Sequence, residues 1–505
     1  MLIALAIFSK VFGFFRQALI AARFGSGIET DTYFMAQSAI ALFSIIITSS
    51  LATTTIPILS RIGTLEGKKG KIEHTSNMLS ITLLIAVAIS ALAWITAPLV
   101  MKVFAYGFEK EQFEFAVFMM RLGLPIILLA TLSGVFNGYL QSENRFFVSS
   151  MGDITQNISY IIFLIFFASS FGIKGLMITS VIGVAAQLII LVVASKALGF
   201  RYSPILNFKD KYIQQAFALV PPILLSIAIS DVNSMIDKAM ASTLVEGSIS
   251  ALDYADRLKS LVINIFVLTI ITVLYPLLSK AAAEEDIKEV KKTTVQGINL
   301  ILLITIPATV GMLILAKPIV QIAYERGVFD TLATQMTTGA FTFYTLSLVT
   351  SSINILIARV FYSLHDTKTP MINSVIAIVV NVAMNIILIK PLAHSGLALA
   401  TSISSMVATV TLLFLLRKKT GALGLGKIVV CTIKSIISSL IMAIVVWLLY
   451  SKTKTLFGTN FFGEFCGLLI PIGAGATLYL LLLYIFKVEE LFWAIGMFKN
   501  RTKRL

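Results

Sequence analysis

The sequence has 505 residues, of which 57% are hydrophobic and 13% are charged. A soluble protein of this length usually has about a quarter of its residues charged. The formal net charge of +15 would suit a nucleic-acid partner, but the lysines and arginines cluster in alternate loops, as the positive-inside rule requires. Composition therefore indicates a multi-span helical membrane protein without a nucleic-acid partner. Unbroken apolar runs of about 20 residues exclude a β-barrel.

These apolar runs predict about fourteen membrane-spanning helices joined by short loops. In chain order we expect spans at 2–23, 31–60, 77–103, 115–140, 149–171, 174–196, 214–240, 251–279, 294–316, 335–363, 370–390, 394–416, 428–450 and 463–486. Lysine and arginine concentrate in every second loop and in the C-terminal tail, so both termini are expected in the cytoplasm. The first span lacks a small-residue cleavage site followed by polar sequence, so we expect it to be retained.

Two cations, Lys10 and Arg16, lie inside the first span. Arg16 is about fifteen residues, or ~22 Å, from the cytoplasmic end. Snorkelling toward an interface is one explanation for each cation. The alternative is a wet cavity or a charged partner, because an intramembrane cation costs ~2.5–3.5 kcal/mol. Lys10 and Gln17 share a helix face while Arg16 points about 120° away, so both faces border a cavity only if it is wide. Such a cavity suits an anionic substrate, for example a phosphate.

The chain also contains an internal repeat. The segment "APLVMKVFAYGFEKEQFEFA" (97–116) resembles "AKPIVQIAYERGVFDTLATQ" (316–335), and "GYLQSENRFFVSS" (138–150) resembles "VFYSLHDTKTPMINS" (360–374). The same offset aligns Asn157 with Asn381. Six spans are thus followed by six similar spans in the same orientation, related by an axis along the membrane normal. We expect an N-lobe at 1–200, a C-lobe at 201–420, and two further spans with a basic tail at 421–505.

The repeat aligns Arg16 of the first lobe with Asp237 of the second lobe. A cation in one lobe therefore corresponds to an anion in the other. Asn381 and Asn385 present two amide oxygens on one helix face. Together with Asp237 and a hydroxyl such as Thr401, they would form an all-oxygen site for a hard cation. Interhelical hydrogen bonding by the asparagines is the alternative.

Other polar positions have a structural explanation beside the functional one. The stretch "SALDYADRLKS" (250–260) contains Asp253, Asp256, Arg257 and Lys259, and it also suits an interfacial helix start. Asp31 is placed to act as an N-cap of the second span. The two cysteines, Cys431 and Cys466, lie in apolar runs and indicate neither a disulfide nor a metal site.

Several motifs resemble the MurJ/MviN family of lipid II flippases. They are "FGFFRQALIAARFGSGIETDTYFMA", "EGSISALDYADRL", "ERGVFD", "FYSLHDTKTPM" and "HSGLALATS", and they span about residues 8–420 in order. The resemblance implies the fold of the MOP exporter superfamily, with two six-helix lobes and two extra helices that form a groove for a lipid tail. It also implies alternating access that moves undecaprenyl-pyrophosphate-linked peptidoglycan precursor to the outer leaflet.

The same resemblance assigns roles to residues. Arg16 and Arg257 match arginines thought to bind the pyrophosphate, Lys10 falls where the family often has arginine, and Asp31 matches an acidic residue after the first span. Gln17 completes the expected substrate site. The possible Na⁺ ligands implied by the family are Asp237, Asn381, Asn385, the Leu397 carbonyl and Thr401.

Three departures mark an atypical member. Gln17 replaces a usual aspartate, "ALFSIIITSS" (41–50) lacks the usual charges, and Asn385 replaces a carboxylate. A flippase for another polyprenyl-linked glycan, such as an exopolysaccharide or teichoic-type precursor, is therefore the main alternative. A cation-coupled drug exporter would favour an acidic first lobe, and a membrane enzyme would need larger loops. We expect a monomeric, non-enzymatic transporter of the bacterial cytoplasmic membrane, with Na⁺ as a possible coupling ion and no other cofactor.

Overall fold

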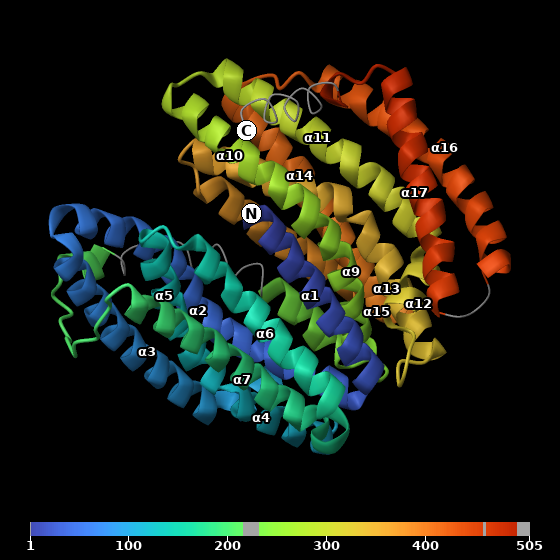
Figure 1. Ribbon diagram of the computed structural model, residues 1–505. Helices are drawn as coiled ribbons and strands as arrows, with labels where there is room; N and C mark the ends of the chain where they lie inside the picture. The colour runs from blue at the N-terminus through green and yellow to red at the C-terminus, as the bar shows by residue number, and fades with distance from the viewer. Residues whose placement is uncertain (1, 216–231, 458–460, 492–505) are drawn as a thin grey trace. The chain divides into compact units, whose positions relative to one another are not determined.

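The computed structural model describes residues 2–215, 232–457 and 461–491, and within these ranges it is helical with no strand (Figure 1). By internal contacts the chain divides into two units. Unit 1 comprises Met1–Ala251 and Arg326–Asp330, and unit 2 comprises Leu252–Glu325 and Thr331–Leu505. The lobe boundaries expected from the sequence stay a prediction. Part of the seventh expected span, 216–231, lies outside the described residues.

Unit 1 is a bundle of long apolar helices (Figure 1). Its helices are α1 (Leu2–Phe24), α2 (Ile28–Leu65), α3 (Gly67–Phe104), α4 (Lys110–Gly123), α5 (Pro125–Ser142), α6 (Phe146–Phe166) and α7 (Ala168–Ala197), followed by a helical stretch at 232–241. Helix α5 packs against α2, α3 and α7, while α6 packs against α1 and α7. Proline at the first position of α5 suits a helix start, because that residue has no intrahelical N–H bond to lose.

The chain leaves α7 through a segment that lies along α3. This segment, residues 200–213, is held by polar side chains of α3: the Asn77 side chain bonds both the N–H and the carbonyl of Asn207. The His74 ring contacts Asp210 at 2.5 Å through Nδ1 and Glu66 at 3.0 Å through Nε2. The route out of α7 is therefore fixed to α3 by hydrogen bonds.

Unit 2 holds the remaining helices. They are α9 (Ser248–Val262, whose first turn belongs to unit 1), the π-helix η1 (Ile263–Val267), α10 (Leu268–Ala283), α11 (Ile287–Ile314), α12 (Ala316–Tyr324), α13 (Thr331–Leu346), α14 (Leu348–Ser363), α15 (Lys368–Thr420), α16 (Leu425–Phe457) and α17 (Phe461–Ile485). Helix α11 packs against α10, α14 and α16, and α16 packs against α17. A π-helix inside a continuous run often marks a functional position.

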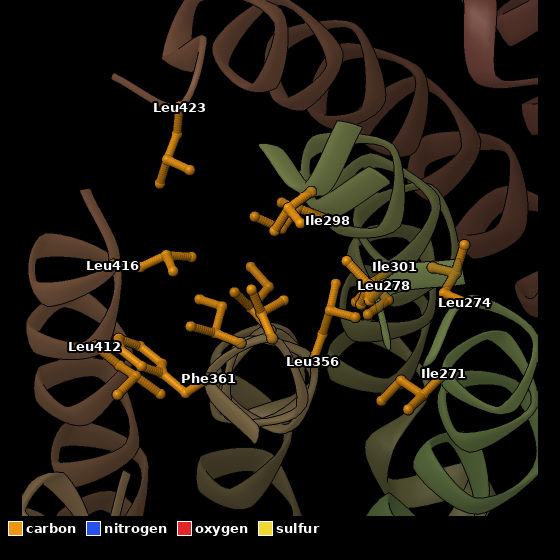
Figure 2. Close-up of a cluster of buried hydrophobic side chains, with 14 of the residues drawn as sticks. Ile271, Leu274, Leu278, Ile298, Ile301, Leu356, Phe361, Leu412, Leu416 and Leu423 are labelled. Atoms are coloured by element: carbon orange, nitrogen blue, oxygen red, sulfur yellow. The ribbon is translucent and has the colours of Figure 1, made fainter. Parts of the chain in front are cut away.

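A hydrophobic core joins α10, α11, α14 and α15 of unit 2 (Figure 2). Leu278, Ile301, Leu356 and Leu416 are buried in it. Figure 2 shows these side chains converging from several helices. Within a membrane, such contacts stabilise through van der Waals packing rather than through removal of apolar surface from water, so this cluster holds these four helices of unit 2 together by close packing.

The backbone supports the internal repeat. Helix α7 is interrupted at Gly172 (φ 56°) and α15 at Ala393 (φ 48°), 221 positions later. The turns before α6 and α15 contain Asn144 (φ 59°) and His365 (φ 55°), which are also 221 positions apart. In each turn the positive-φ residue donates its N–H to the carbonyl three residues earlier, and the next residue donates to the carbonyl five residues before it. The two halves therefore share local structure as well as sequence.

Eight helices within the described residues are long and apolar enough to cross a membrane, or nine if the bent pair α13 and α14 is one span. That count takes α15 as one helix of 53 residues, although Ala393 divides it into two segments that were each expected to span. The all-helical, multi-span fold is confirmed. The number fourteen stays a prediction.

Candidate functional site

Arg16 lies against an aromatic ring in unit 1. Its guanidinium carbon is 4.7 Å from the centre of the Tyr160 ring, on α6. A cation over an aromatic face is stabilised by about 0.5–2 kcal/mol, more when water is excluded. Arg16 is only partly buried. The stacking on Tyr160 therefore gives the charge a defined position in the unit.

Tyr160 is itself fixed by a polar cluster that sequence analysis did not predict. Its hydroxyl donates to Ser180 at 2.7 Å and accepts from the Gln37 amide at 3.2 Å. The Gln37 amide also donates to Tyr33 at 2.6 Å. These residues come from α2, α6 and α7, so no spacing along one helix identifies them. The cluster positions the ring on which Arg16 rests.

The other cations and amides of α1 lie in different surroundings. Lys10 is exposed, and its ammonium acts electrostatically on the Asp153 carboxyl of α6. Gln17 is buried, with 2% of its surface exposed. Asn157 donates to the Ser9 carbonyl at 3.4 Å, which links α6 to α1. Within unit 1, the expected site residues of α1 therefore occupy both exposed and buried positions.

Asp31 holds the start of α9. Its carboxylate accepts hydrogen bonds from Gly247 N at 2.8 Å, Ser250 N at 2.7 Å and the Ser250 hydroxyl at 2.6 Å. The N-cap of α2 itself is Gly27, without a side-chain cap. Asp31 therefore acts as a cap, but for α9 rather than for its own helix. An anionic group near a helix N-terminus is also favoured by the helix dipole.

Three sequence motifs meet at this point of unit 1. The Ser26 hydroxyl donates to the Gly247 carbonyl at 3.0 Å and lies 2.8 Å from the Ser250 hydroxyl. Val328 N donates to the Ala22 carbonyl at 3.0 Å. The "AARFGSGIETD", "EGSIS" and "GVFD" motifs are thus joined by hydrogen bonds among backbone and small side chains. We call these contacts the loop junction.

Close backbone approach requires glycine in the loop junction. Gly327 has φ 64°, and a Cβ there would collide with the Ala22 carbonyl. Gly247 has φ 86°, and a Cβ there would lie 2.9 Å from Ser26. Both positions therefore need glycine for conformation and for space.

The charged residues of α9 form two ion pairs in unit 2. Arg257 Nε donates to Asp253 Oδ2 at 2.6 Å, and Lys259 Nζ contacts Asp256 Oδ1 at 2.6 Å. The Lys259 ammonium also lies 4.8 Å from the Tyr344 ring centre. Arg257 thus has a carboxylate partner one turn away on its own helix. The i, i+4 spacing in the sequence was a signal for this pair.

Four of the five expected ion ligands are linked by hydrogen bonds in unit 2. Asn385 Nδ2 donates to Asn381 Oδ1 at 3.0 Å, and Asn381 Nδ2 lies 3.3 Å from Thr401 Oγ1. The Thr401 hydroxyl in turn donates to the Leu397 carbonyl at 3.1 Å. The break at Ala393 turns α15 back, so that its two segments contribute to one polar cluster.

Asp237, the fifth expected ligand, lies in unit 1 in the helical stretch 232–241 and is 5% exposed. Its neighbour Lys238 donates to Ser38 at 2.8 Å. In the described part of the chain, no group of three or more histidine, cysteine, aspartate or glutamate side chains is placed to hold a metal. An ion in unit 2 would therefore depend on amide, hydroxyl and carbonyl oxygens.

A known protein family and individual proteins resemble this chain in sequence. A sequence model of the family "Lipid II flippase MurJ" matches residues 20–466. A probable lipid II flippase MurJ of Rickettsia prowazekii (strain Madrid E) is 29% identical over 405 residues, covering 79% of this chain and 80% of that protein. A probable lipid II flippase MurJ of Rhizobium tropici is 26% identical, covering 90% and 86%.

Solved structures show the same fold. A lipid II flippase MurJ in an inward closed conformation superposes with TM-score 0.77 and 27% identity, covering 96% of this chain and 98% of the other. An inward-facing MATE family multidrug transporter of the MOP superfamily gives TM-score 0.72 at 15% identity, covering 82% and 95%. The latter likeness concerns the fold alone.

The helices form a multi-span membrane protein with the fold shared by the solved MurJ and MATE structures, the MOP-superfamily fold. Within that class, the match over residues 20–466 is decisive: the chain belongs to the lipid II flippase MurJ family.

Proposed function

We propose that this protein flips lipid II, the undecaprenyl-pyrophosphate-linked peptidoglycan precursor, from the inner to the outer leaflet of the bacterial cytoplasmic membrane. The observation that carries the proposal is the family match over residues 20–466, which includes Asp31, Asp237 and Arg257. Transport proceeds by alternating access and breaks no covalent bond. Both termini lie in the cytoplasm, and the protein acts as a monomer.

Arg16 and Arg257 are assigned to the pyrophosphate. A guanidinium presents several donors in a rigid plane and binds phosphate oxygens in pairs. The stacking of Arg16 on Tyr160 supports this role, because it fixes the plane before the ligand arrives. The Nε of Arg257 donates to Asp253, which orients the guanidinium that we assign to the phosphate.

The remaining expected substrate residues act around these arginines. Exposed Lys10 raises the local positive potential that attracts the headgroup. Gln17 supplies a neutral amide next to Arg16, where an aspartate would weaken the positive field. Asp31 contributes by holding the start of α9, the helix that carries Arg257.

Na⁺ is proposed as the coupling ion. A hard cation prefers oxygen ligands, and Asn381, Asn385, Leu397 and Thr401 bring amide, carbonyl and hydroxyl oxygens together in unit 2. Asp237 would add the negative charge. These residues would hold the ion when it is bound, and the ion would bias which conformation the transporter adopts.

Complementation tests the transport proposal. The wild-type chain is expected to rescue a strain depleted of its own lipid II flippase, whereas Arg16→Ala and Arg257→Ala are expected to fail at equal expression. Arg23→Ala is the matched control, because Arg23 is an exposed cation on the same helix as Arg16. Failure of the wild type would instead favour another polyprenyl-linked glycan. Full rescue by both variants would exclude the arginine assignment.

Sodium dependence tests the ion proposal separately. In proteoliposomes, Asp237→Ala and Asn381→Leu are expected to remove the dependence of lipid II transport on external Na⁺. Asn157→Leu is the matched control, since Asn157 occupies the corresponding position in the first half of the repeat. Unchanged Na⁺ dependence in both test variants would place the coupling site elsewhere.

A further inference from the structure

A basic cleft lies at one end of unit 2, where α11 and α16 begin and α17 ends. It consists of two adjoining cavities, of about 520 Å³ and about 210 Å³, which share Lys427, Glu489 and Glu490 in their walls. The larger volume is typical of small-molecule sites, which span roughly 300–1,000 Å³. Five lysines and two glutamates line the cleft: Lys291, Lys292, Lys427, Lys434, Lys487, Glu489 and Glu490.

Some of these charges are already engaged. Lys292 pairs with Glu289 at 3.1 Å, and Lys434 donates to the Phe486 carbonyl at 2.7 Å. Glu490 accepts a hydrogen bond of 2.5 Å from the Asn299 amide. Within the described ranges, Lys291, Lys427 and Lys487 form no ion pair. The cleft therefore keeps a surplus of positive charge.

The backbone adds to this positive character. Helix α16 begins at Leu425, directly after the cleft residues Leu423 and Gly424. The first N–H groups of a helix have no intrahelical acceptor and favour an anion. The ammonium of Lys291 lies beside Gly421, at the end of α15. Lysines and a helix start thus act on the same space, and both favour an anion such as a phosphate group.

The cleft also adjoins an apolar surface. Val430 lines the smaller cavity and is 53% exposed, its neighbour Val429 is exposed too, and Ile433 and Ile437 are exposed on the next turns of α16. Exposed apolar side chains on a membrane-spanning helix contact acyl chains. A free phosphate would make no use of this surface, whereas a phospholipid would contact both parts of it.

We propose that this basic cleft binds the headgroup phosphate of an anionic phospholipid such as phosphatidylglycerol, with the acyl chains along α16. Basic pockets between helices at the cytoplasmic side of membrane proteins suit such headgroups, and the lysine-rich end of unit 2 is the end expected in the cytoplasm. The lysines of the cleft have no assigned part in lipid II binding, whereas α16 is one of the two extra helices expected to form the lipid-tail groove, so the tests use phosphatidylglycerol without lipid II.

Native mass spectrometry of the full-length protein in detergent tests the site. The first bound phosphatidylglycerol is expected to dissociate roughly tenfold more readily from Lys291→Gln/Lys427→Gln than from the wild type. Phosphatidylcholine binding is expected to be equal in the two. Lys452→Gln/Lys454→Gln is the matched control, because these exposed lysines lie near the other end of α16. It is expected to bind phosphatidylglycerol as the wild type does.

Two further measurements complete the test. Lys291→Arg/Lys427→Arg is expected to retain binding, because the charge is preserved. Inorganic phosphate is expected to compete only at concentrations far above that of the lipid. Equal phosphatidylglycerol binding by the glutamine variant and the wild type would overturn the proposal. So would displacement of the lipid by inorganic phosphate at matched concentration, which would assign the cleft to a free anion.

Discussion

Asp31, in the first turn of α2, caps the first turn of α9 by accepting hydrogen bonds from both the backbone N–H and the hydroxyl of Ser250. The two residues are 219 positions apart in the chain. Their contact ties the first helical hairpin of unit 1 to the helix that carries Arg257. Loss of the cap should therefore affect both stability and substrate binding.

Replacing Asp31 by alanine is expected to lower the free energy of unfolding by about 2–4 kcal/mol, since three donors lose a buried charged acceptor. Asp31→Asn keeps one acceptor oxygen and should cost less. Thermal unfolding of the purified protein in detergent measures both effects. Glu29→Gln, an exposed neighbour in the same turn, should leave the melting temperature unchanged. A normal melting temperature with weakened lipid II binding in Asp31→Asn would instead indicate direct substrate contact.

The ring of Tyr160 is expected to matter more than its hydroxyl for lipid II affinity. Tyr160→Leu removes the surface under Arg16 and should weaken binding about threefold to tenfold. Tyr160→Phe retains the ring but loses the hydrogen bonds to Ser180 and Gln37, so it should weaken binding less than Tyr160→Leu does. Titration with lipid II measures the difference. Trp94→Leu serves as the control, because Trp94 forms a similar contact with Arg121 away from Arg16. Equal losses in the leucine and phenylalanine variants would contradict the stacking role.

Gly327→Ala is expected to open the loop junction, because a Cβ at this positive-φ position collides with the Ala22 carbonyl. The hydrogen bond from Val328 N to Ala22 should lengthen or break. Faster hydrogen exchange at Val328 and a lower melting temperature would show this. Gly311→Ala is the control: it is helical with open space around it, so alanine should stabilise by about 0.5–1 kcal/mol. Unchanged exchange at Val328 in Gly327→Ala would contradict the expectation.

Asp366, in the turn between α14 and α15, is expected to make stability depend on pH. Partial burial opposes its charge, but hydrogen bonds from Lys419 and Thr369 outweigh this and lower the pKa of the Asp366 carboxyl below its usual value. Because the pKa of Asp366 is lower in the folded state, its contribution to the free energy of unfolding is complete above the ordinary carboxyl pKa of about 4. This contribution disappears as pH falls through the lower folded value.

Thermal unfolding across pH measures this contribution. The wild type should melt higher than Lys419→Met at neutral pH, and the difference should shrink below about pH 4. Lys418→Met is the control, because Lys418 is exposed and forms no ion pair among the described residues. A constant difference between wild type and Lys419→Met down to the most acidic pH would exclude the ion pair as its source.

Much of the fold could be predicted because hydropathy reports directly on membrane-spanning helices. The expected span 31–60 lies within α2, and 294–316 overlaps α11. The break at Ala393 falls between the expected spans 370–390 and 394–416, so the sequence placed a boundary there. The π-helix η1 was missed, because it rearranges backbone hydrogen bonds inside the expected span 251–279 without interrupting the apolar run.

Residues of the candidate site could be predicted from the sequence where the residue type alone is unusual for its surroundings. Arg16 and Asp237 are conspicuous as charges within apolar sequence. Tyr160, by contrast, is an ordinary residue whose role comes from tertiary contact with Arg16. The partner of Asp31 was also unpredictable, because a capping bond across more than two hundred residues leaves no local pattern.

Gly172 and Ala393 interrupt corresponding helices, although only one of them is glycine. A positive φ at alanine costs on the order of 1–3 kcal/mol, so local preference does not explain the second break. The break lies at the position that corresponds to Gly172 in the internal repeat, and the packing around it must over-determine the conformation of Ala393. The same repeat aligns Arg16 with Asp237, so equivalent positions of the two halves share backbone structure while carrying opposite charge.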